Sequence, residues 1–430
     1  MTAPNTPANR RASTDSLAEA GNRCCIVGGG PAGVVLGFLL ARAGIPVIVL
    51  EKHADFFRDF RGDTVHPSTL QILHELGLLE RFLARPHQEY RSISARIGEH
   101  EVVVADFAGL PTAAKFLVVM PQWDFLDFLV TEARRYPSFS IRMNSEVTGL
   151  IEEDGVVRGV RIGGVAGQTD IRARLVVGAD GRRSAVRALS GLAVAELGAP
   201  IDVLWFSVSR RADDPEQPLA RFLDGRISVL ISRGDYYQCG LVVRKGTFEA
   251  LKAAGLDSFR RLLGDSIPVL SGRTGELASW DDVKLLTVRI DRLRTWHRPG
   301  LLCIGDAAHA MSPIGGVGIN LAVQDAVATA NVLSEPLARH ELVTSMMLAG
   351  IQQRRAFPTW ATQRAQVMLQ NMIIRVLSRP TSGALPFPFW LLNRFPRLRR
   401  LPARLVGLGL RPEHVRSRVE ATERATECAP

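Results

Sequence analysis

The sequence predicts an α/β fold with a doubly wound parallel sheet, an inserted β-sheet that is mostly antiparallel, and a C-terminal helical extension. Three features of the 430 residues predict it. Short apolar runs near the front, the middle and the back each end in glycine and a polar turn, as buried parallel strands do. Short strands with alternating apolar residues fill the interval between the second and third runs. Apolar residues at helical spacing follow the third run.

The first apolar run is Cys24 to Val27, and three glycines follow it on the GxGxxG spacing before an apolar helix begins. This order of strand, turn and helix is that of a Rossmann-like dinucleotide-binding unit. In such a unit the first glycine allows a tight turn, the second lets the backbone approach a pyrophosphate, and the third lets helix and strand pack closely. The free N–H groups at the start of the helix favour phosphate. The predicted cofactor contacts in this segment are Gly28, Gly30, Pro31, Ala32 and Gly33.

A second predicted strand, IPVIVLEK, leads to Glu51, which lies 18 residues beyond Gly33. A carboxylate at that point can accept hydrogen bonds from both ribose hydroxyls, which favours a dinucleotide with a free 2′-OH, such as FAD or NAD. We predict that Glu51 and the adjacent Lys52 contact the cofactor.

The second and third apolar runs repeat the plan of a strand that ends near an aspartate. The segment LVVGADGRRSAVR carries Asp180, and GLLCIGDAAHAMSP carries Asp306. Ligands of open parallel sheets bind outside the carboxyl ends of the strands, so both aspartates are predicted to face the crevice of the first glycine turn. Asp306 is the natural acceptor for a ribityl hydroxyl. The glycine-rich turn Pro313–Asn320 opens another apolar helix, whose N–H groups can stabilise the electron-rich edge of a reduced flavin.

In this order and spacing, the three segments resemble the fingerprints of the single-component FAD-dependent aromatic monooxygenases of the para-hydroxybenzoate hydroxylase type, over roughly residues 23 to 345. The resemblance implies non-covalently bound FAD, NADH or NADPH as the reductant, and reaction with O2 to a flavin C4a-hydroperoxide. It also implies transfer of one oxygen atom to an aromatic, quinone-like or polyketide-like small molecule. No motif of the family names a substrate-binding residue in this chain.

The resemblance further implies roles for individual residues. Arg61 follows the acidic strand and Gln122 opens a later helix, and both occupy places that contact FAD in such enzymes. Asp180 is associated with FAD and with the nicotinamide coenzyme. The remaining cofactor contacts that the resemblance implies are Val147, Asp306, Gly315, Gly318, Ile319 and Asn320.

No set of catalytic side chains is required, because the cofactor carries out the redox chemistry. The protein binds and orients the cofactor and the substrate and excludes water from the site. The candidate catalytic residues are Pro313, in the glycine-rich turn, and His66, between the arginine segment and the next helix. An imidazole titrates near neutrality and can assist deprotonation of a phenol. For His309, which follows the third strand, a structural role in the turn is the stronger interpretation.

The positions of these segments predict the domain organisation, and residues 84–120 are expected to contribute to the substrate layer. The predicted parts are a disordered leader (1–22), an FAD-binding domain (23–198 with 288–345), a substrate domain (199–287) and a C-terminal helical extension (346–430). Four side chains of the substrate domain are candidates for a wall over the flavin, although each is more often plain core. They are Phe206, Tyr236, Tyr237 and Cys239.

Composition limits other classes of function. The five cysteines show no metal-ligand spacing, so no metal site is predicted. The net charge of +10 comes without a nucleic-acid-binding signature, so no nucleic acid is expected. The densest arginine cluster, around ALPFPFWLLNRFPRLRRLPARL, is interpreted either as a solvated surface or as a cationic, aromatic segment on an anionic membrane. We expect a cytoplasmic protein, soluble or peripheral to the membrane, that is a monomer or a homodimer.

Other reactions of the same fold stay open. A halogenase should carry a WxWxIP segment, which this sequence lacks. A reductase or oxidase would share the same cofactor motifs. A further alternative is a binding protein in which the flavin is a redox sensor or a structural prop.

Overall fold

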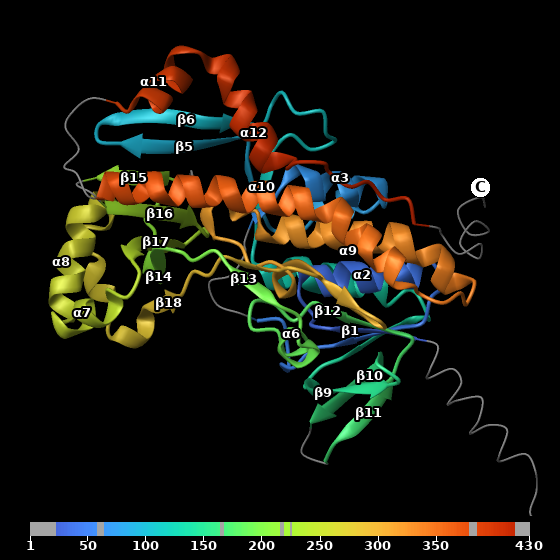
Figure 1. Cartoon of the computed structure of the whole chain (residues 1–430). Helices are drawn as coiled ribbons and strands as arrows, with labels where there is room; N and C mark the ends of the chain where they lie inside the picture. Colours follow the sequence, from blue (N-terminus) through green and yellow to red (C-terminus); the bar gives the residue numbers. More distant parts are fainter. Residues whose placement is uncertain are drawn as a thin grey trace, which may run out of the picture.

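The computed structural model describes residues 23–57, 64–163, 167–215, 219–223, 226–377 and 385–417 (Figure 1). The predicted leader and Arg61 lie outside these residues. The described part combines a mainly parallel sheet with helices on one of its sides, a second large sheet, and helices near the C-terminus. This α/β architecture confirms the predicted fold class.

The central element is a six-stranded sheet in the order β20-β21-β12-β1-β2-β8. Its strands are β1 (Cys24–Val27), β2 (Val47–Leu50), β8 (Phe139–Arg142), β12 (Leu175–Gly178), β20 (His297–Arg298) and β21 (Leu301–Cys303). Neighbouring strands are parallel except β20 and β21. Every residue of β1, β2 and β12 is buried, as expected for parallel strands that are covered on both faces.

Helices lie on one side of this sheet and a small sheet lies on the other (Figure 1). On the first side, α2 (Pro31–Arg42) packs against α5 (Gln122–Ala133) and α9 (Gly318–Ala338). The small sheet contains β9 (Glu146–Glu153), β10 (Val156–Gly163) and β11 (Thr169–Arg172). The turn residues of the sequence EEDG favour a hairpin. Strands β9 and β10 form that hairpin, and Asp154 and Gly155 in its turn adopt positive φ angles of 49° and 76°.

The second large sheet has the order β18-β14-β17-β16-β15-β5-β6. Its strands are β5 (Ser92–Ile97), β6 (His100–Asp106), β14 (Ile201–Ser209), β15 (Leu219–Leu223), β16 (Arg226–Ser232), β17 (Tyr236–Arg244) and β18 (Lys284–Leu286). The pair of β15 and β5 is parallel and the other pairs are antiparallel. The sheet is therefore mostly antiparallel, as predicted, and combines an early hairpin with strands from the middle of the chain.

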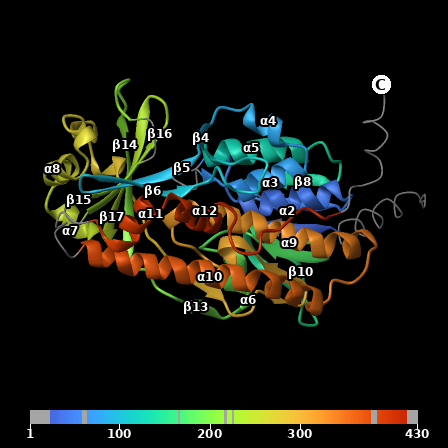
Figure 2. The ribbon, with the colours of Figure 1, turned by 90° about the horizontal axis from the view of Figure 1, so that it is seen from above.

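Two helices, α7 (Phe248–Ala253) and α8 (Leu256–Ser266), cover the face of the second sheet that points away from the parallel sheet (Figure 2). The side chains of Phe206, Tyr237 and Cys239 belong to the buried core on this face, together with residues of α8. These three residues are core side chains, and the alternative of a wall over the flavin is not supported for them. Tyr236 lies at the start of β17 and is 37% exposed.

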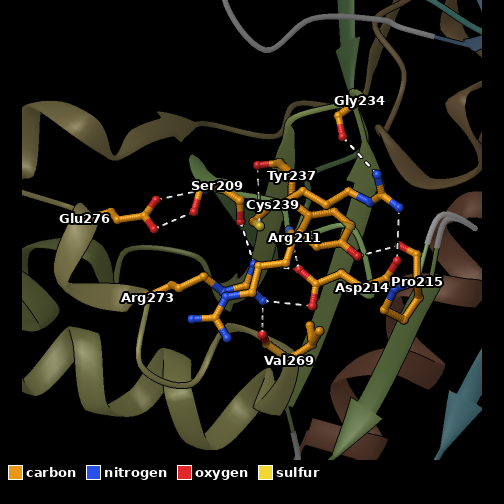
Figure 3. Close-up of polar contacts among 11 residues, drawn as sticks. Ser209, Arg211, Asp214, Pro215, Gly234, Tyr237, Cys239, Val269, Arg273 and Glu276 are labelled. Carbon is orange, nitrogen blue, oxygen red and sulfur yellow. Dashed lines mark hydrogen bonds and ion pairs between the residues drawn. The ribbon is translucent and has the colours of Figure 1, made fainter.

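A polar cluster braces the end of this sheet where β14 ends and β17 begins (Figure 3). The Arg273 guanidinium contacts the two carboxylate oxygens of Asp214 at 2.5 and 3.1 Å and donates to the Ser209 carbonyl at 2.8 Å. The Tyr237 hydroxyl donates to the Pro215 carbonyl. The cluster therefore fixes the loop that follows β14, and it gives Tyr237 a structural partner.

Smaller elements connect the two large sheets. A three-stranded antiparallel sheet contains β3 (Thr64–Val65), β7 (Leu117–Val119) and β4 (Gln88–Tyr90), and β13 (Val194–Glu196) pairs with β19 (Asp291–Leu293). The short α-helices are α3 (Pro67–Glu75), α4 (Leu79–Leu83) and α6 (Ala185–Ser190). The 3₁₀ helices are η1 (Pro268–Leu270), η2 (Thr274–Glu276), η3 (Trp280–Asp282), η4 (Gly305–Ala307), η5 (Ile314–Gly316) and η6 (Pro396–Arg399).

Helix α10 (Ser345–Leu377) runs along the molecule from α9 to the second sheet (Figure 2). Two shorter helices, α11 (Phe387–Arg394) and α12 (Arg400–Gly407), pack on β6. Among the described residues, no helix combines the length and apolar character needed to cross a membrane.

Candidate cofactor site at the strand ends

The register of the parallel sheet brings the three predicted motifs together. Val27 at the end of β1 is aligned with Leu50 of β2 on one side and with Gly178 of β12 on the other. Gly178 is in turn aligned with Cys303 of β21. The residues that follow these four aligned ends are Gly28, Glu51, Asp180 and Asp306 with their neighbours. Segments far apart in the sequence therefore meet at one edge of the sheet.

Glycine is required where these segments touch. Gly28 has a φ of 109°, and a Cβ there would lie 2.4 Å from the Ala179 carbonyl oxygen. A Cβ at Gly33 would lie 1.9 Å from the Gly28 carbonyl oxygen. Gly305 has a φ of 59°, and its Cβ would lie 3.1 Å from the Cβ of Ala32. The first motif thus meets the backbone of the second motif at Ala179, and its Ala32 side chain meets the third motif at Gly305.

The start of α2 leaves space for a ligand. A Cβ at Gly30 would meet no atom of the described residues within 4 Å. Gly30 is the N-cap of α2, no side chain caps this helix, its first turn holds Pro31, and no acidic residue is present there. The N–H groups of the first turn therefore face an open cradle that suits a pyrophosphate.

The acidic residue after β2 is held beside this turn. The Glu51 carboxylate accepts hydrogen bonds from the Gly29 N–H at 2.9 Å and the His53 N–H at 3.0 Å. Lys52 is exposed, and Gln122 is half-buried in the first turn of α5. The Val147 side chain packs in the hydrophobic core, so any contact of this residue with a cofactor would have to come from its backbone.

The aspartate of the second motif organises its own turn. The Asp180 carboxylate accepts hydrogen bonds from the Ser184 hydroxyl at 2.5 Å and the Val186 N–H at 3.1 Å, and Ser184 caps α6. Burial raises the pKa of Asp180, although these hydrogen bonds oppose the shift. Arg182 from the same turn donates to the Asp306 carboxylate at 3.2 Å. Both partners of that pair are partly exposed, so Asp306 stays accessible at the edge of the crevice.

The glycine-rich turn of the third motif leads into α9. Gly315 and Gly316 adopt positive φ angles of 82° and 62°, Pro313 is half-buried, and α9 begins at Gly318 without a side-chain cap. Ile319 and Asn320 are buried in the first turn of α9. This turn therefore leaves the first N–H groups of α9 without a side-chain cap.

Asn320 joins this turn to α3. Its Oδ1 atom accepts hydrogen bonds from the Thr69 hydroxyl at 2.7 Å and the His66 N–H at 3.1 Å. Its buried Nδ2 atom has no hydrogen-bond partner among the described residues, and the same holds for Nη1 of Arg182. Unpaired buried donors at a crevice of this kind are expected where a polar ligand completes the hydrogen bonding.

His66 lies fully buried between α12 and the glycine-rich turn. Its Nδ1 atom donates to the Val406 carbonyl at 2.7 Å, and its Nε2 atom would be 3.5 Å from a Cβ at Gly316. Burial lowers the pKa of His66 from 6.5 to about 4. The ring is therefore neutral near pH 7, and its geometry favours bracing the turn over proton transfer to a solvent-accessible substrate.

A buried ionic network contacts the third motif at Gly305. The sequence did not indicate this network. The Asp325 carboxylate accepts hydrogen bonds from Nε2 of His309 at 2.6 Å, the Gly305 N–H at 3.0 Å and Nε of Arg355 at 2.9 Å. Arg355 also lies 3.7 Å from the buried Glu413. Burial would raise the pKa of Asp325, but His309 and Arg355 hold it below its ordinary value. His309 thus has a structural partner, in line with the structural interpretation of this residue.

Helix α10 holds the backbone that leads into the glycine-rich turn. Gln363 donates to the Ala310 carbonyl at 3.0 Å, and Gln370 donates to the Ser312 hydroxyl at 2.8 Å. Gln366 accepts from the Ser312 N–H at 3.1 Å and donates to the Ser312 carbonyl at 3.0 Å. The available signal was a stripe of glutamines at positions i, i+3 and i+7 of a predicted helix.

The described residues contain no group of three or more His, Cys, Asp or Glu side chains that could hold a metal ion. The donors at the strand ends are instead backbone N–H groups, carboxylates and amides, which suit the phosphates and hydroxyls of a dinucleotide.

Comparison with known proteins identifies the family. The model of a family described as an FAD binding domain matches residues 22–365. This chain belongs to that FAD-binding family. It is 35% identical to 6-methylpretetramide 4-monooxygenase of Streptomyces rimosus over 385 residues, which cover 89% of this chain and 91% of that protein. It is 31% identical to rifampicin monooxygenase of Streptomyces venezuelae over 321 residues, which cover 70% of this chain and 61% of that longer protein.

Solved structures share the fold. Anhydrotetracycline hydroxylase from Streptomyces rimosus superposes with a TM-score of 0.72 at 24% identity and covers 91% of this chain and 77% of that chain. The p-nitrophenol 4-monooxygenase of Pseudomonas putida superposes with a TM-score of 0.71 at 20% identity and covers 89% of this chain and 96% of that chain. With the family match and the curated relatives, the predicted cofactor and class of enzyme are confirmed, and the chain is an FAD-dependent monooxygenase.

Proposed function

We propose that this enzyme uses NADH or NADPH and O2 to hydroxylate an electron-rich ring of an aromatic polyketide. One observation carries the substrate class, namely the 35% identity to 6-methylpretetramide 4-monooxygenase over nearly the full length of both chains. Smaller phenols and quinone-like molecules are the alternative substrates, and the test below distinguishes them from polyketides. When bound and reduced, FAD would activate O2, and one atom of that O2 would be transferred to the substrate.

We assign the binding roles from the accessible groups at the strand ends. The first turn of α2 binds the pyrophosphate over Gly30, and Glu51 accepts the ribose hydroxyls from its place beside Gly29. Asp306 exchanges its partly exposed contact with Arg182 for a ribityl hydroxyl. The turn that contains Gly315 directs N–H groups at the flavin ring, where they stabilise negative charge.

The remaining candidates receive positioning roles. Pro313 shapes the entry to the glycine-rich turn, since it is the N-cap of η5. His66 keeps this turn and α12 in register through its contact with Val406. Gln122, Lys52 and the backbone of Val147 lie on segments next to the first motif and are proposed to border the adenosine half.

We assign FAD binding and substrate binding to different parts of the chain. Residues 23–198 and 288–345 bind FAD, and residues 199–287 with the hairpin from 84–120 form the substrate layer. On the face of the second sheet opposite α8, Trp205 lies over Gly240, where a Cβ would be 3.1 Å from the indole ring. This face supplies aromatic surface for a planar substrate. We place the enzyme in the cytoplasm, as a monomer or homodimer.

The test is turnover under 18O2 with NADH or NADPH and a panel of phenols, naphthoquinols and polycyclic aromatic polyketides. The expected product carries one labelled oxygen atom, and NAD(P)H oxidation accelerates when the true substrate is present. Gly30→Val, which fills the pyrophosphate cradle, should abolish both signals. Hydrogen peroxide with an unlabelled product would contradict hydroxylation and would favour the oxidase or reductase alternative. A halogenated product in the presence of chloride or bromide would favour the halogenase alternative.

A further inference from the structure

We propose that the outer surface of α11, η6 and α12 binds an anionic lipid bilayer. This α11–α12 surface is defined by five exposed apolar side chains and four exposed arginines. They are Phe387, Trp390, Phe395, Leu401 and Leu405, with Arg394, Arg397, Arg400 and Arg404.

The apolar side chains of this surface face outward. Phe387 and Leu401 are 69% and 68% exposed, and the rings of Phe387 and Trp390 stack with centroids 5.8 Å apart. On α11 the inward position is taken by Phe389, which contacts Phe222 of the second sheet. A helix on an ordinary water-facing surface has polar residues on its outer face, so an outer aromatic stripe indicates a nonpolar partner.

The charge of the surface has one sign. Between residues 385 and 410 the chain carries five arginines and no aspartate, glutamate or lysine. None of the four exposed arginines forms an ion pair with a carboxylate of the described residues. Arginines beside aromatic and leucine side chains match the headgroup and acyl boundary of a membrane that contains anionic lipid.

This charge argues against a second copy of the chain as the partner. In a two-fold symmetric dimer the same patch meets itself, so arginine would face arginine with no acidic residue from the patch to offset the repulsion. A nucleic acid would satisfy the arginines and leave Leu401 and Leu405 without an apolar partner. The lipid surface satisfies both kinds of side chain.

The exposed side of α12 belongs to the α11–α12 surface, and the opposite side of α12 is buried. Ala403 and Gly407 form the buried side of α12, and a Cβ at Gly407 would be 2.9 Å from Leu110. The Val406 carbonyl accepts the hydrogen bond of His66, which adjoins Gly316. A bilayer bound here would thus lie one helix away from this turn. That a lipophilic aromatic substrate enters from the bilayer rests on the proposed function; the lipid binding itself does not.

The test is flotation of the FAD-loaded full chain with phosphatidylcholine vesicles, with and without phosphatidylglycerol. We expect at least tenfold stronger binding when phosphatidylglycerol is present, and weaker binding at high salt. The double variant Phe387→Ser/Trp390→Ser and the double variant Arg400→Glu/Arg404→Glu should each lower binding about tenfold.

Matched controls come from exposed residues outside the surface. Leu342→Ser/Met346→Ser removes apolar side chains that are 73% and 83% exposed near the start of α10, and Arg261→Glu reverses an exposed charge on α8. Both controls should bind vesicles as the parent does. All variants should retain FAD and the parent's thermal midpoint, since the changed side chains are exposed.

Failure of the parent to float, or equal binding by surface variants and controls, would overturn the proposal. A dimer in sedimentation that Phe387→Ser/Trp390→Ser dissociates would also overturn it, in favour of a second copy, and saturable binding of short duplex DNA that displaces the vesicles would do so in favour of nucleic acid. These measurements use no substrate or reductant. Loss of lipid binding therefore leaves the hydroxylation test untouched, and failure of hydroxylation leaves lipid binding untouched.

Discussion

The strand ends of the parallel sheet and the long helix α10 both shape the candidate cofactor site, but they do so by different physical means. The strand ends use short local segments in which glycine permits backbone contact, as between Gly28 and Ala179. Helix α10 uses buried side chains, such as Gln366 and Arg355, that reach backbone or charged groups tens of residues away in the sequence. The contacts at the strand ends depend on residue spacing within short motifs. The contacts of α10 depend on the folded arrangement of residues that are far apart in the sequence.

This difference predicts different consequences of substitution. A side chain added at a strand-end glycine either prevents packing of the motifs or fills the ligand's place. Loss of an α10 side chain leaves the motifs in place and removes the partner of a buried polar group. The predictions below separate these outcomes, beginning with the largest effect.

Gly33→Val should have the largest effect, because its Cβ would overlap the Gly28 carbonyl oxygen at 1.9 Å. We expect a destabilisation of more than about 3 kcal/mol, seen as insoluble or unfolded protein by circular dichroism. Gly30→Val is the matched control, since its Cβ meets open space among the described residues. It should fold, with the thermal midpoint of the FAD-free parent, and should lack FAD. If the two variants showed the same folding and the same FAD content, this would contradict a role of Gly33 in packing and a role of Gly30 in leaving space for the ligand.

Arg355→Met should lower the free energy of unfolding by about 3 to 5 kcal/mol, because it leaves the buried Asp325 and Glu413 without their shared cation. Chemical denaturation measures this loss. Arg354→Met is the control, since that side chain also binds Glu413 but is 43% exposed, and it should cost about 1 kcal/mol. Equal losses for the two variants would contradict the buried network as the support of the third motif.

His66 should make stability depend on pH. Its folded pKa of about 4 lies below the unfolded value of 6.5, so the unfolded chain binds more protons in that interval. Stability is therefore fully present above pH 6.5 and is lost as the pH falls toward 4, by up to about 3 kcal/mol. His66→Asn keeps a donor for Val406 and does not titrate, so it should lose less stability over the same interval. Parallel pH profiles for parent and variant would contradict the buried neutral ring.

Gln366→Leu should lower stability by about 1 to 3 kcal/mol, because the Ser312 N–H and carbonyl lose their partner. It should also weaken FAD binding severalfold, measured by flavin fluorescence titration, since the glycine-rich turn loosens. Gln352→Leu removes comparable hydrogen bonds to Trp296 and Arg294 outside the turn. This control should lose stability and keep the parent's FAD affinity. Similar FAD affinities for the two variants would mean that α10 stabilises the fold without shaping the site.

The sequence predicted which segments meet at the strand ends. Gly28, Glu51 and Asp306 could be placed there because each comes shortly after an apolar strand, and parallel strands end at one edge of a sheet. The hairpin at Asp154 and the mostly antiparallel second sheet were predictable because turn residues and alternation are local.

The supports of the site could not be predicted in this way. Asp325 sits in an apolar helix, and its partners His309 and Arg355 lie 16 and 30 residues away on either side. The helix that contains Gln366 has apolar spacing that indicates core, with no signal of which backbone it would reach. The side chains of Tyr237 and Cys239 could not be assigned to a face, because strand alternation does not say which face α8 covers.

The most direct measurement for the central claim, that the strand ends hold FAD, is the FAD dissociation constant of Asp306→Ala by calorimetry. Loss of this charged acceptor should cost about 1.5 to 3 kcal/mol, which raises the constant about ten- to a hundredfold. The control is Asp170→Ala, since Asp170 forms an exposed pair with Arg161 at 2.8 Å in the small sheet of β9 to β11, and its FAD affinity should match the parent. Unchanged affinity in Asp306→Ala, or equal weakening in both variants, would contradict the claim.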